Sequence, residues 1–135
     1  MTTAYLDSSF LLSIVLGESR AAGLRRILIR YDRLLSSDLI VAECLSTAHR
    51  EAIDRAAMIT ALRPIDLVLP SRSLATEMGE ALNEGYLRGA DLWHVACAMF
   101  VAATERSELA FLSRDEAQRR VARRLGFPEI GRAHV

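Results

Sequence analysis

The chain has 135 residues, a formal net charge of zero and 51% hydrophobic residues. This length fits one domain that buries about two-thirds of its unfolded surface, and we predict a single domain over residues 1–130 with a short tail at 131–135. Zero net charge excludes an overall basic field of the kind that attracts polyanions. The surplus of apolar residues predicts that part of the surface is buried against a partner protein.

The N-terminus and the cysteines predict the compartment. The first residues, Met-Thr-Thr-Ala, carry neither the charged start nor the long apolar run of a signal peptide. Cys44 and Cys97 are isolated thiols in apolar helical segments, which is typical of a reducing compartment. The longest apolar run, 92–103, is shorter than the roughly 20 residues that a membrane span needs. We therefore expect a cytoplasmic protein without a membrane partner.

Short apolar, β-prone runs alternate with helical patterns along the chain. Strands are expected at 3–6, 34–36, 64–70 and 109–112, with a last short one at 127–130. Apolar periodicity predicts helices over 10–16, 19–31, 39–50 continuing through 51–62, 71–83, 91–103 and 115–125, the last one closed by Gly126. This alternation indicates an α/β fold with a parallel sheet.

The segment from Leu92 to Ala103 is apolar at every position except His94. A helix that is apolar all round is predicted to be buried. Asp91 stands at the start of this helix, where a carboxylate accepts hydrogen bonds from free backbone N–H groups. Asp91 is therefore either an N-cap or a functional acid.

Three further acids have comparable positions. Asp7 directly follows the first strand, and Asp115 comes three residues after the strand at 109–112. The carboxyl ends of parallel strands are where ligands bind in α/β sheets. Glu43 lies inside a predicted helix on a face with apolar neighbours. Asp7 and Asp115 can be N-caps as well, but capping does not explain Glu43.

Four acids at one edge of a sheet repel one another unless a positive charge lies among them. Ligand sets made only of oxygen select hard cations such as Mg²⁺ or Mn²⁺. A metal in such a site activates water and neutralises charge on a phosphoryl group. The arrangement thus favours Mg²⁺ as cofactor, with Mn²⁺ as a substitute.

The segments that carry these acids resemble the signature segments of PIN-domain proteins, and in length and spacing the chain is most similar to VapC-type toxins. The matching pieces are Tyr5-Leu6-Asp7-Ser8-Ser9, Ala42-Glu43, Gly89 to Ala96 and Phe111-Leu112-Ser113-Arg114-Asp115. The resemblance implies a PIN-like α/β/α sandwich with a short-stranded parallel sheet. It also implies a Mg²⁺-dependent endoribonuclease that is the toxin of a type II toxin–antitoxin pair.

The same resemblance assigns roles to six residues. It implies that Asp7 and Asp91 are the principal metal ligands, and that Glu43 and Asp115 bind metal directly or through water. It implies small hydroxyl groups beside the acids, which here are Ser9 and Ser113. The expected partners are RNA, a small antitoxin protein and a second copy of the chain.

Two other functions are open at this stage. One is a phosphoacceptor, receiver-like signalling domain, although such domains usually carry a Lys near the site and this chain has none. The other is a catalytically silent PIN-like module that binds RNA or protein. His94 is interpreted as an interior or rim residue and not a catalyst. The arginines at 119, 120, 123 and 124 are interpreted as the solvated face of the last helix, with Ala117, Val121 and Leu125 turned inward. Phosphate or antitoxin binding by these arginines is the alternative.

Overall fold

The computed structural model describes residues 2–104 and 108–128. Within these ranges the chain forms four strands, β1 (Thr3–Leu6), β2 (Arg33–Ser37), β3 (Ile65–Val68) and β4 (Leu109–Leu112). The same ranges contain seven helices, α1 (Ser8–Val15), α2 (Ala21–Leu28), α3 (Leu39–Arg50), α4 (Arg55–Leu62), α5 (Ala75–Glu84), α6 (Gly89–Thr104) and α7 (Glu116–Arg124). None of the helices in this part of the chain is both long and apolar enough to cross a bilayer.

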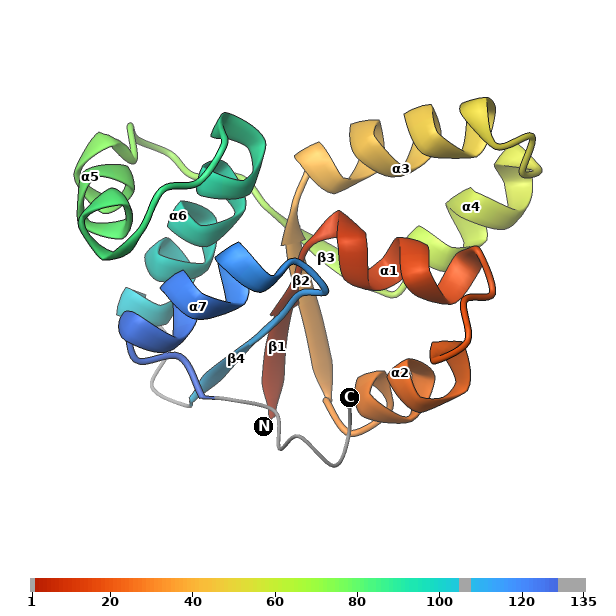
Figure 1. Cartoon of the computed structure of the whole chain (residues 1–135), viewed down its shortest axis with the longest axis horizontal. Coiled ribbons are helices and arrows are strands. Elements are labelled where there is room, and N and C mark those ends of the chain that lie inside the picture. Colours follow the sequence, from red (N-terminus) through yellow and green to blue (C-terminus); the bar gives the residue numbers. More distant parts are fainter. Residues whose placement is uncertain (1, 105–107, 129–135) are drawn as a thin grey trace.

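The strands form one parallel sheet in the order β3-β2-β1-β4. Side chains alternate between its two faces, so that Ala4 and Leu6 enter one hydrophobic cluster and Tyr5 enters the other. Helices α1 to α4 cover the first face, and α5 to α7 cover the second (Figure 1). The predicted α/β/α sandwich with a short-stranded parallel sheet is thereby confirmed.

One predicted helix is interrupted. The pattern runs on from Arg50 to Leu62, but α3 ends at Arg50 and α4 begins at Arg55. Ala52 has a φ of 56°, and the Ile53 N–H donates to the carbonyl of Ala48 at 2.8 Å, which is the hydrogen bond of a Schellman C-cap. This position favours glycine, so the sequence gives no sign of the break. Asp54 then caps α4 by accepting from the backbone N–H of Ala57 at 3.2 Å.

Two further expectations differ from the structure. Helix α6 is fully buried only over residues 94–98, while Met99 and Phe100 are half-buried and Ala103 is exposed. Met99, Ala102 and Ala103 line a pocket, which is why the apolar pattern of the second half of α6 exceeds its burial. Phe127 and Pro128 lie in no strand, and the rest of the predicted strand at 127–130 and the tail at 131–135 fall outside the described residues.

The sheet brings four helix starts to one place. Strands β1, β2 and β4 end at the same edge, and α1, α3 and α7 begin within a few residues of those ends. Helix α6 begins at the same end of the molecule (Figure 1). The backbone N–H of Asp7 joins the end of β1 to the end of β4 by donating to the carbonyl of Leu112 at 3.2 Å. The candidate site lies at this edge.

Candidate active site

Asp7 is the most buried acid of the site. It follows β1 directly and is the N-cap of α1, with an extended backbone at φ −92° and ψ 176°. Its Oδ1 atom accepts from the Phe10 N–H at 3.2 Å and from the Ser9 hydroxyl at 2.7 Å, and its Oδ2 atom accepts from the Ser113 hydroxyl at 2.9 Å. The carboxylate is thus held in place from three sides although the residue is only 2% exposed.

Burial governs the acidity of Asp7. Loss of solvent raises its pKa to about 6, and the hydrogen bond from Ser9, the electrostatic effect of the nearby His94 ring and the hydrogen bonds from Ser113 and Phe10 oppose this rise. An ionised carboxylate in low dielectric is unfavourable unless hydrogen bonds or an opposite charge compensate it. The three donors around Asp7 compensate in part, so a cation beside it would stabilise the ionised form further.

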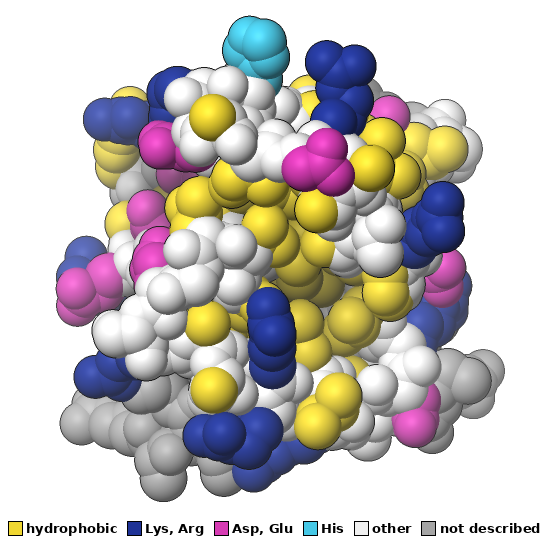
Figure 2. Space-filling model, turned by 90° about the vertical axis from the view of Figure 1, so that its right-hand side faces the viewer, with side chains coloured by type: hydrophobic (Ala, Val, Ile, Leu, Met, Phe, Trp, Pro, Cys, Tyr) yellow, Lys and Arg dark blue, Asp and Glu magenta, His cyan; other side chains and the backbone are white. Residues whose placement is uncertain are grey.

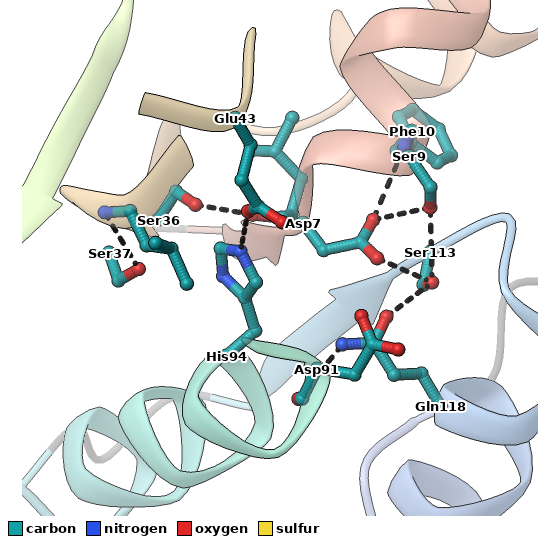
Figure 3. A network of polar contacts seen from close by, with 12 residues as sticks. Asp7, Ser9, Phe10, Ser36, Ser37, Glu43, Asp91, His94, Ser113 and Gln118 are labelled. Carbon is teal, nitrogen blue, oxygen red and sulfur yellow. Dashed lines mark hydrogen bonds and ion pairs between the residues drawn. The ribbon is translucent and has the colours of Figure 1, made fainter. Parts of the chain in front are cut away.

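Ser113 links Asp7 to α7. Its hydroxyl oxygen accepts from the Asp115 N–H at 2.9 Å, and it lies 2.9 Å from Oε1 of Gln118 and 3.3 Å from the hydroxyl of Ser9. Asp115 is the N-cap of α7 and accepts from the Gln118 N–H at 2.9 Å. Asp7 and Asp115 are therefore both N-caps and members of one polar network, of which Figure 3 shows Asp7, Ser113 and Gln118. The capping and the functional interpretation do not exclude each other here.

Asp91 lies in the first turn of α6. The helix begins at Gly89, two residues earlier than the sequence pattern indicates, so Asp91 is a first-turn acid and not the cap. Its pKa is raised by desolvation and then by the charges of Asp115 and Glu43, against which His94 and Arg88 act. This mutual repulsion is the electrostatic sign that acids from α3, α6 and α7 face a common space.

Glu43 projects from α3 toward α6. Its Oε1 atom lies 2.7 Å from Nε2 of His94, and its side chain is 27% exposed. The neighbouring Ile40 is fully buried, in agreement with the prediction that Glu43 shares an inward face with the apolar turn before it. Figure 3 shows Glu43, Asp7 and Asp91 coming from three different elements toward the same region.

The comparisons with known proteins identify the fold family. The sequence profile of the PIN domain matches residues 4–124, which is most of the chain. This chain belongs to the PIN-domain family. Its structure is similar to that of VapC20 of Mycobacterium tuberculosis, a toxin that cleaves the sarcin-ricin loop, with a TM-score of 0.59 and 16% sequence identity over 94% of this chain and 98% of that chain. No curated protein sequence matches.

This PIN domain brings the six residues predicted from the sequence to one edge of its sheet. Hydrogen bonds join Asp7, Ser9, Ser113 and Asp115. The charges of Asp115 and Glu43 raise the pKa of Asp91, and Glu43 also contacts His94. Because the chain belongs to the PIN-domain family, its fold is not that of the phosphoacceptor signalling domain considered above. The roles of the six residues in metal binding and catalysis remain predictions.

Two contacts of this PIN domain were missed by the sequence interpretation. Gln118 is fully buried, and its Nε2 donates to the carbonyl of Asp91 at 3.0 Å, so it connects α7 to α6. Ala117, which was predicted to face inward, is exposed in its place. The spacing Asp-x-x-Gln at 115–118 is a helix-start pattern that could have drawn attention to Gln118. His94 is interior as predicted, at 1% exposure, but its contact with Glu43 was not foreseen.

The donor set of the PIN domain fits a hard divalent cation. All four acids offer oxygen, which is the ligand type that Mg²⁺ and Mn²⁺ prefer. Within the described residues, no three Asp, Glu, His or Cys side chains already converge closely enough to hold a metal ion by themselves. Mg²⁺ is compatible with such a spread arrangement, because it is usually bound through one or two carboxylates and keeps several waters.

Proposed function

We propose that this PIN domain is a metal-dependent endoribonuclease that hydrolyses RNA phosphodiester bonds with water as the nucleophile. The observation that carries the proposal is the gathering of Asp7, Glu43, Asp91 and Asp115 at the carboxyl edge of a parallel sheet in a chain of the PIN family. Four carboxylates at one edge of a sheet are difficult to explain as purely structural, because each one raises the free energy of ionising the others.

Each acid has a role in this proposal. Asp7 and Asp91 hold Mg²⁺, for which Mn²⁺ can substitute, and Glu43 and Asp115 complete the shell directly or through water. When bound, the metal supplies an activated water and neutralises charge on the phosphoryl group. The chain itself contributes orientation. Ser9 and Ser113 donate to the two oxygens of Asp7 at 2.7 and 2.9 Å and keep that carboxylate in one rotamer.

We further propose that the protein is the toxin of a type II pair and binds a small antitoxin. Figure 2 shows a hollow lined with hydrophobic side chains on the side of the molecule formed by α1 to α4. These helices carry half-buried apolar residues packed against the core, including Leu12, Val15, Leu45, Leu62 and Val41. A large exposed apolar surface of this kind supports a protein partner. VapC20, whose fold is similar, is a toxin.

Self-association and compartment complete the proposal. Large apolar side chains are also exposed, with Leu69 at 70% and Tyr86 at 81%, and a two-fold dimer is the commonest form of a homo-oligomer. Cys44 and Cys97 are free and buried, which supports residence in the cytoplasm together with the RNA substrate.

RNA cleavage by the purified, metal-stripped protein tests the function. End-labelled RNA is incubated with the protein in EDTA and after addition of Mg²⁺ or Mn²⁺, beside the variants Asp91→Asn and Asp54→Asn. Asp54 caps α4 and serves as a matched acid outside the site. We expect cleavage only with added metal, loss of cleavage in Asp91→Asn and normal cleavage in Asp54→Asn. Full activity in EDTA would remove the metal from the proposal, and no cleavage of any RNA with metal present would favour the catalytically silent binding module.

A further inference from the structure

A buried chain of polar contacts leads from β2 to Glu43 through two aromatic side chains. The backbone N–H of Ser37 donates to the Tyr5 hydroxyl at 3.0 Å. The Tyr5 hydroxyl lies 2.8 Å from Nδ1 of His94, and Nε2 of His94 lies 2.7 Å from Oε1 of Glu43. Figure 3 shows the His94 ring between α6 and the carboxylate of Glu43. These contacts end at Glu43, which is one of the acids of the proposed site.

The direction of each hydrogen bond follows from what each group can do. A backbone N–H can only donate, so the Tyr5 oxygen accepts from Ser37. An ionised carboxylate can only accept, so Nε2 of His94 carries the hydrogen that points to Glu43, and Nδ1 of the neutral ring accepts the Tyr5 proton. Burial raises the pKa of Tyr5, so the hydroxyl keeps this proton. With Nδ1 as acceptor, the ring carries its hydrogen on Nε2 and donates it to Glu43. Tyr5 thereby selects the tautomer in which His94 is a donor to the carboxylate.

Among these polar contacts, the donor His94 is held rigidly, whereas the acceptor Glu43 has more freedom to move. Tyr5 is completely buried and stacks on Phe111 with a centroid separation of 5.6 Å, while His94 is 1% exposed and meets the edge of Tyr5 at 5.9 Å. The Glu43 side chain is 27% exposed and has several rotatable bonds. A fixed donor that holds one carboxylate oxygen leaves the other oxygen in a restricted set of positions toward the site.

We propose that His94, held in its tautomer by Tyr5, is a positioning residue that orients the Glu43 carboxylate toward the space shared by Asp7 and Asp91. The proposal rests on the proposed function, since it concerns how one acid is presented to a divalent cation. His94 follows Asp91 by one turn of α6, so the same helix presents one acid itself and orients a second acid from α3. The competing explanation is a buried histidine that satisfies its own polar atoms and affects stability alone.

The test uses three substitutions in the full chain. His94→Leu removes the donor while keeping an apolar group of similar bulk. His94→Gln keeps an N–H donor near the position of Nε2. Tyr5→Phe keeps the stacked ring but removes the hydroxyl that selects the tautomer. Ile27 is a buried residue of α2, and Ile27→Val is the control for a small loss of packing far from Glu43.

The primary readout is the dissociation constant for Mn²⁺, measured by calorimetry on the metal-free protein without RNA. Loss of an orienting partner behind a metal ligand typically weakens metal affinity or activity about 10- to 100-fold. We expect a weakening in this range for His94→Leu, a smaller one for Tyr5→Phe, and affinity close to the parent for His94→Gln and Ile27→Val. Equal affinities for His94→Leu and the parent, or equal losses for His94→Leu and His94→Gln, would overturn the proposal.

Nitrogen-15 NMR of the His94 ring provides a second readout that does not depend on metal or activity. We expect the parent to show hydrogen on Nε2 and an acceptor Nδ1, and Tyr5→Phe to lose this preference. A parent ring with hydrogen on Nδ1 alone would overturn the proposal, even if His94→Leu fails to fold. The proposed function can fail on its own. If the parent protein binds Mn²⁺ and has the expected His94 tautomer but cleaves no RNA, the proposed function is wrong and the positioning role of His94 stands.

Discussion

Replacing Asp7 by Asn changes one charge in a buried position while keeping the shape of the side chain. The amide oxygen can accept from Phe10 and Ser9 as the Oδ1 atom does now. The amide nitrogen takes the place of Oδ2 and donates to the Ser113 hydroxyl, whose proton is then free for Oε1 of Gln118 at 2.9 Å. Asn is also a good N-cap, so the helix start should survive the change.

The size of the effect follows from the pKa of Asp7, which burial raises from 3.8 to about 6. Because one pKa unit corresponds to about 1.36 kcal/mol, ionised Asp7 destabilises the metal-free native state by about 3 kcal/mol at pH 8. The native state binds the proton more tightly than the unfolded chain does, so this penalty falls as pH drops through 6 toward 3.8. At pH 4.5 about 1 kcal/mol remains.

We therefore expect Asp7→Asn to be more stable than the parent protein in EDTA. Burying an amide also costs free energy, so the gain at pH 8 should be about 1–3 kcal/mol, or very roughly 4–12 °C in melting temperature for a chain of this size. The difference should shrink at pH 4.5. Thermal and urea unfolding at the two pH values measure it, with Asp54→Asn as a control that changes an exposed N-cap.

Saturating Mg²⁺ should reverse this order, because a ligand that binds the native state stabilises it by about 2.7 kcal/mol at 100 times its dissociation constant. The parent should gain stability with Mg²⁺, and Asp7→Asn should gain little. If Asp7→Asn is less stable than the parent at pH 8 in EDTA, Asp7 is a net-stabilising cap. In that case ionised Asp7 does not destabilise the metal-free native state, and the reasoning above is wrong.

Three other outcomes are expected. Glu43→Gln keeps an oxygen that can accept from His94, so the unfolding free energy should change little. It removes the negative charge, so it should weaken Mg²⁺ binding and slow cleavage. A sharp loss of stability with normal activity per folded molecule would make Glu43 structural. Ca²⁺ should restore cleavage poorly after EDTA treatment, because its coordination is larger and looser than that of Mg²⁺, and cleavage equal to that with Mg²⁺ would argue against a tight octahedral site. Sedimentation should show a dimer at micromolar concentration, and a monomer alone would refute self-association.

Much of the fold could be predicted from local pattern. Strands β1 and β4 have the predicted bounds, because their apolar runs end at the polar residues Asp7 and Ser113. The break between α3 and α4 could not be predicted, since Ala52 occupies the left-handed position that glycine usually takes. The limited burial of α6 depends on where the helix layer ends, which no local periodicity reports.

The acids of the candidate site could be found because parallel strands deliver their ends to one edge. Asp7 follows β1 directly and Asp115 comes three residues after β4, so topology alone places them together. The partners of these acids could not be found in this way. Glu43 and His94 are 51 residues apart, and their contact depends on how α3 and α6 pack across the sheet edge. The same holds for Gln118 and Asp91, which are joined across 27 residues.

The central claim is that these carboxylates form one metal site, and anomalous diffraction from crystals soaked in Mn²⁺ tests it most directly. The expected result is a strong anomalous peak bonded to carboxylate oxygens of Asp7 and Asp91 at about 2.1 Å, with Glu43 and Asp115 contacting it directly or through water. The claim would be contradicted if crystals soaked in saturating Mn²⁺ showed no peak at this edge of the sheet and Asp7 kept its hydrogen bonds to Ser9 and Ser113.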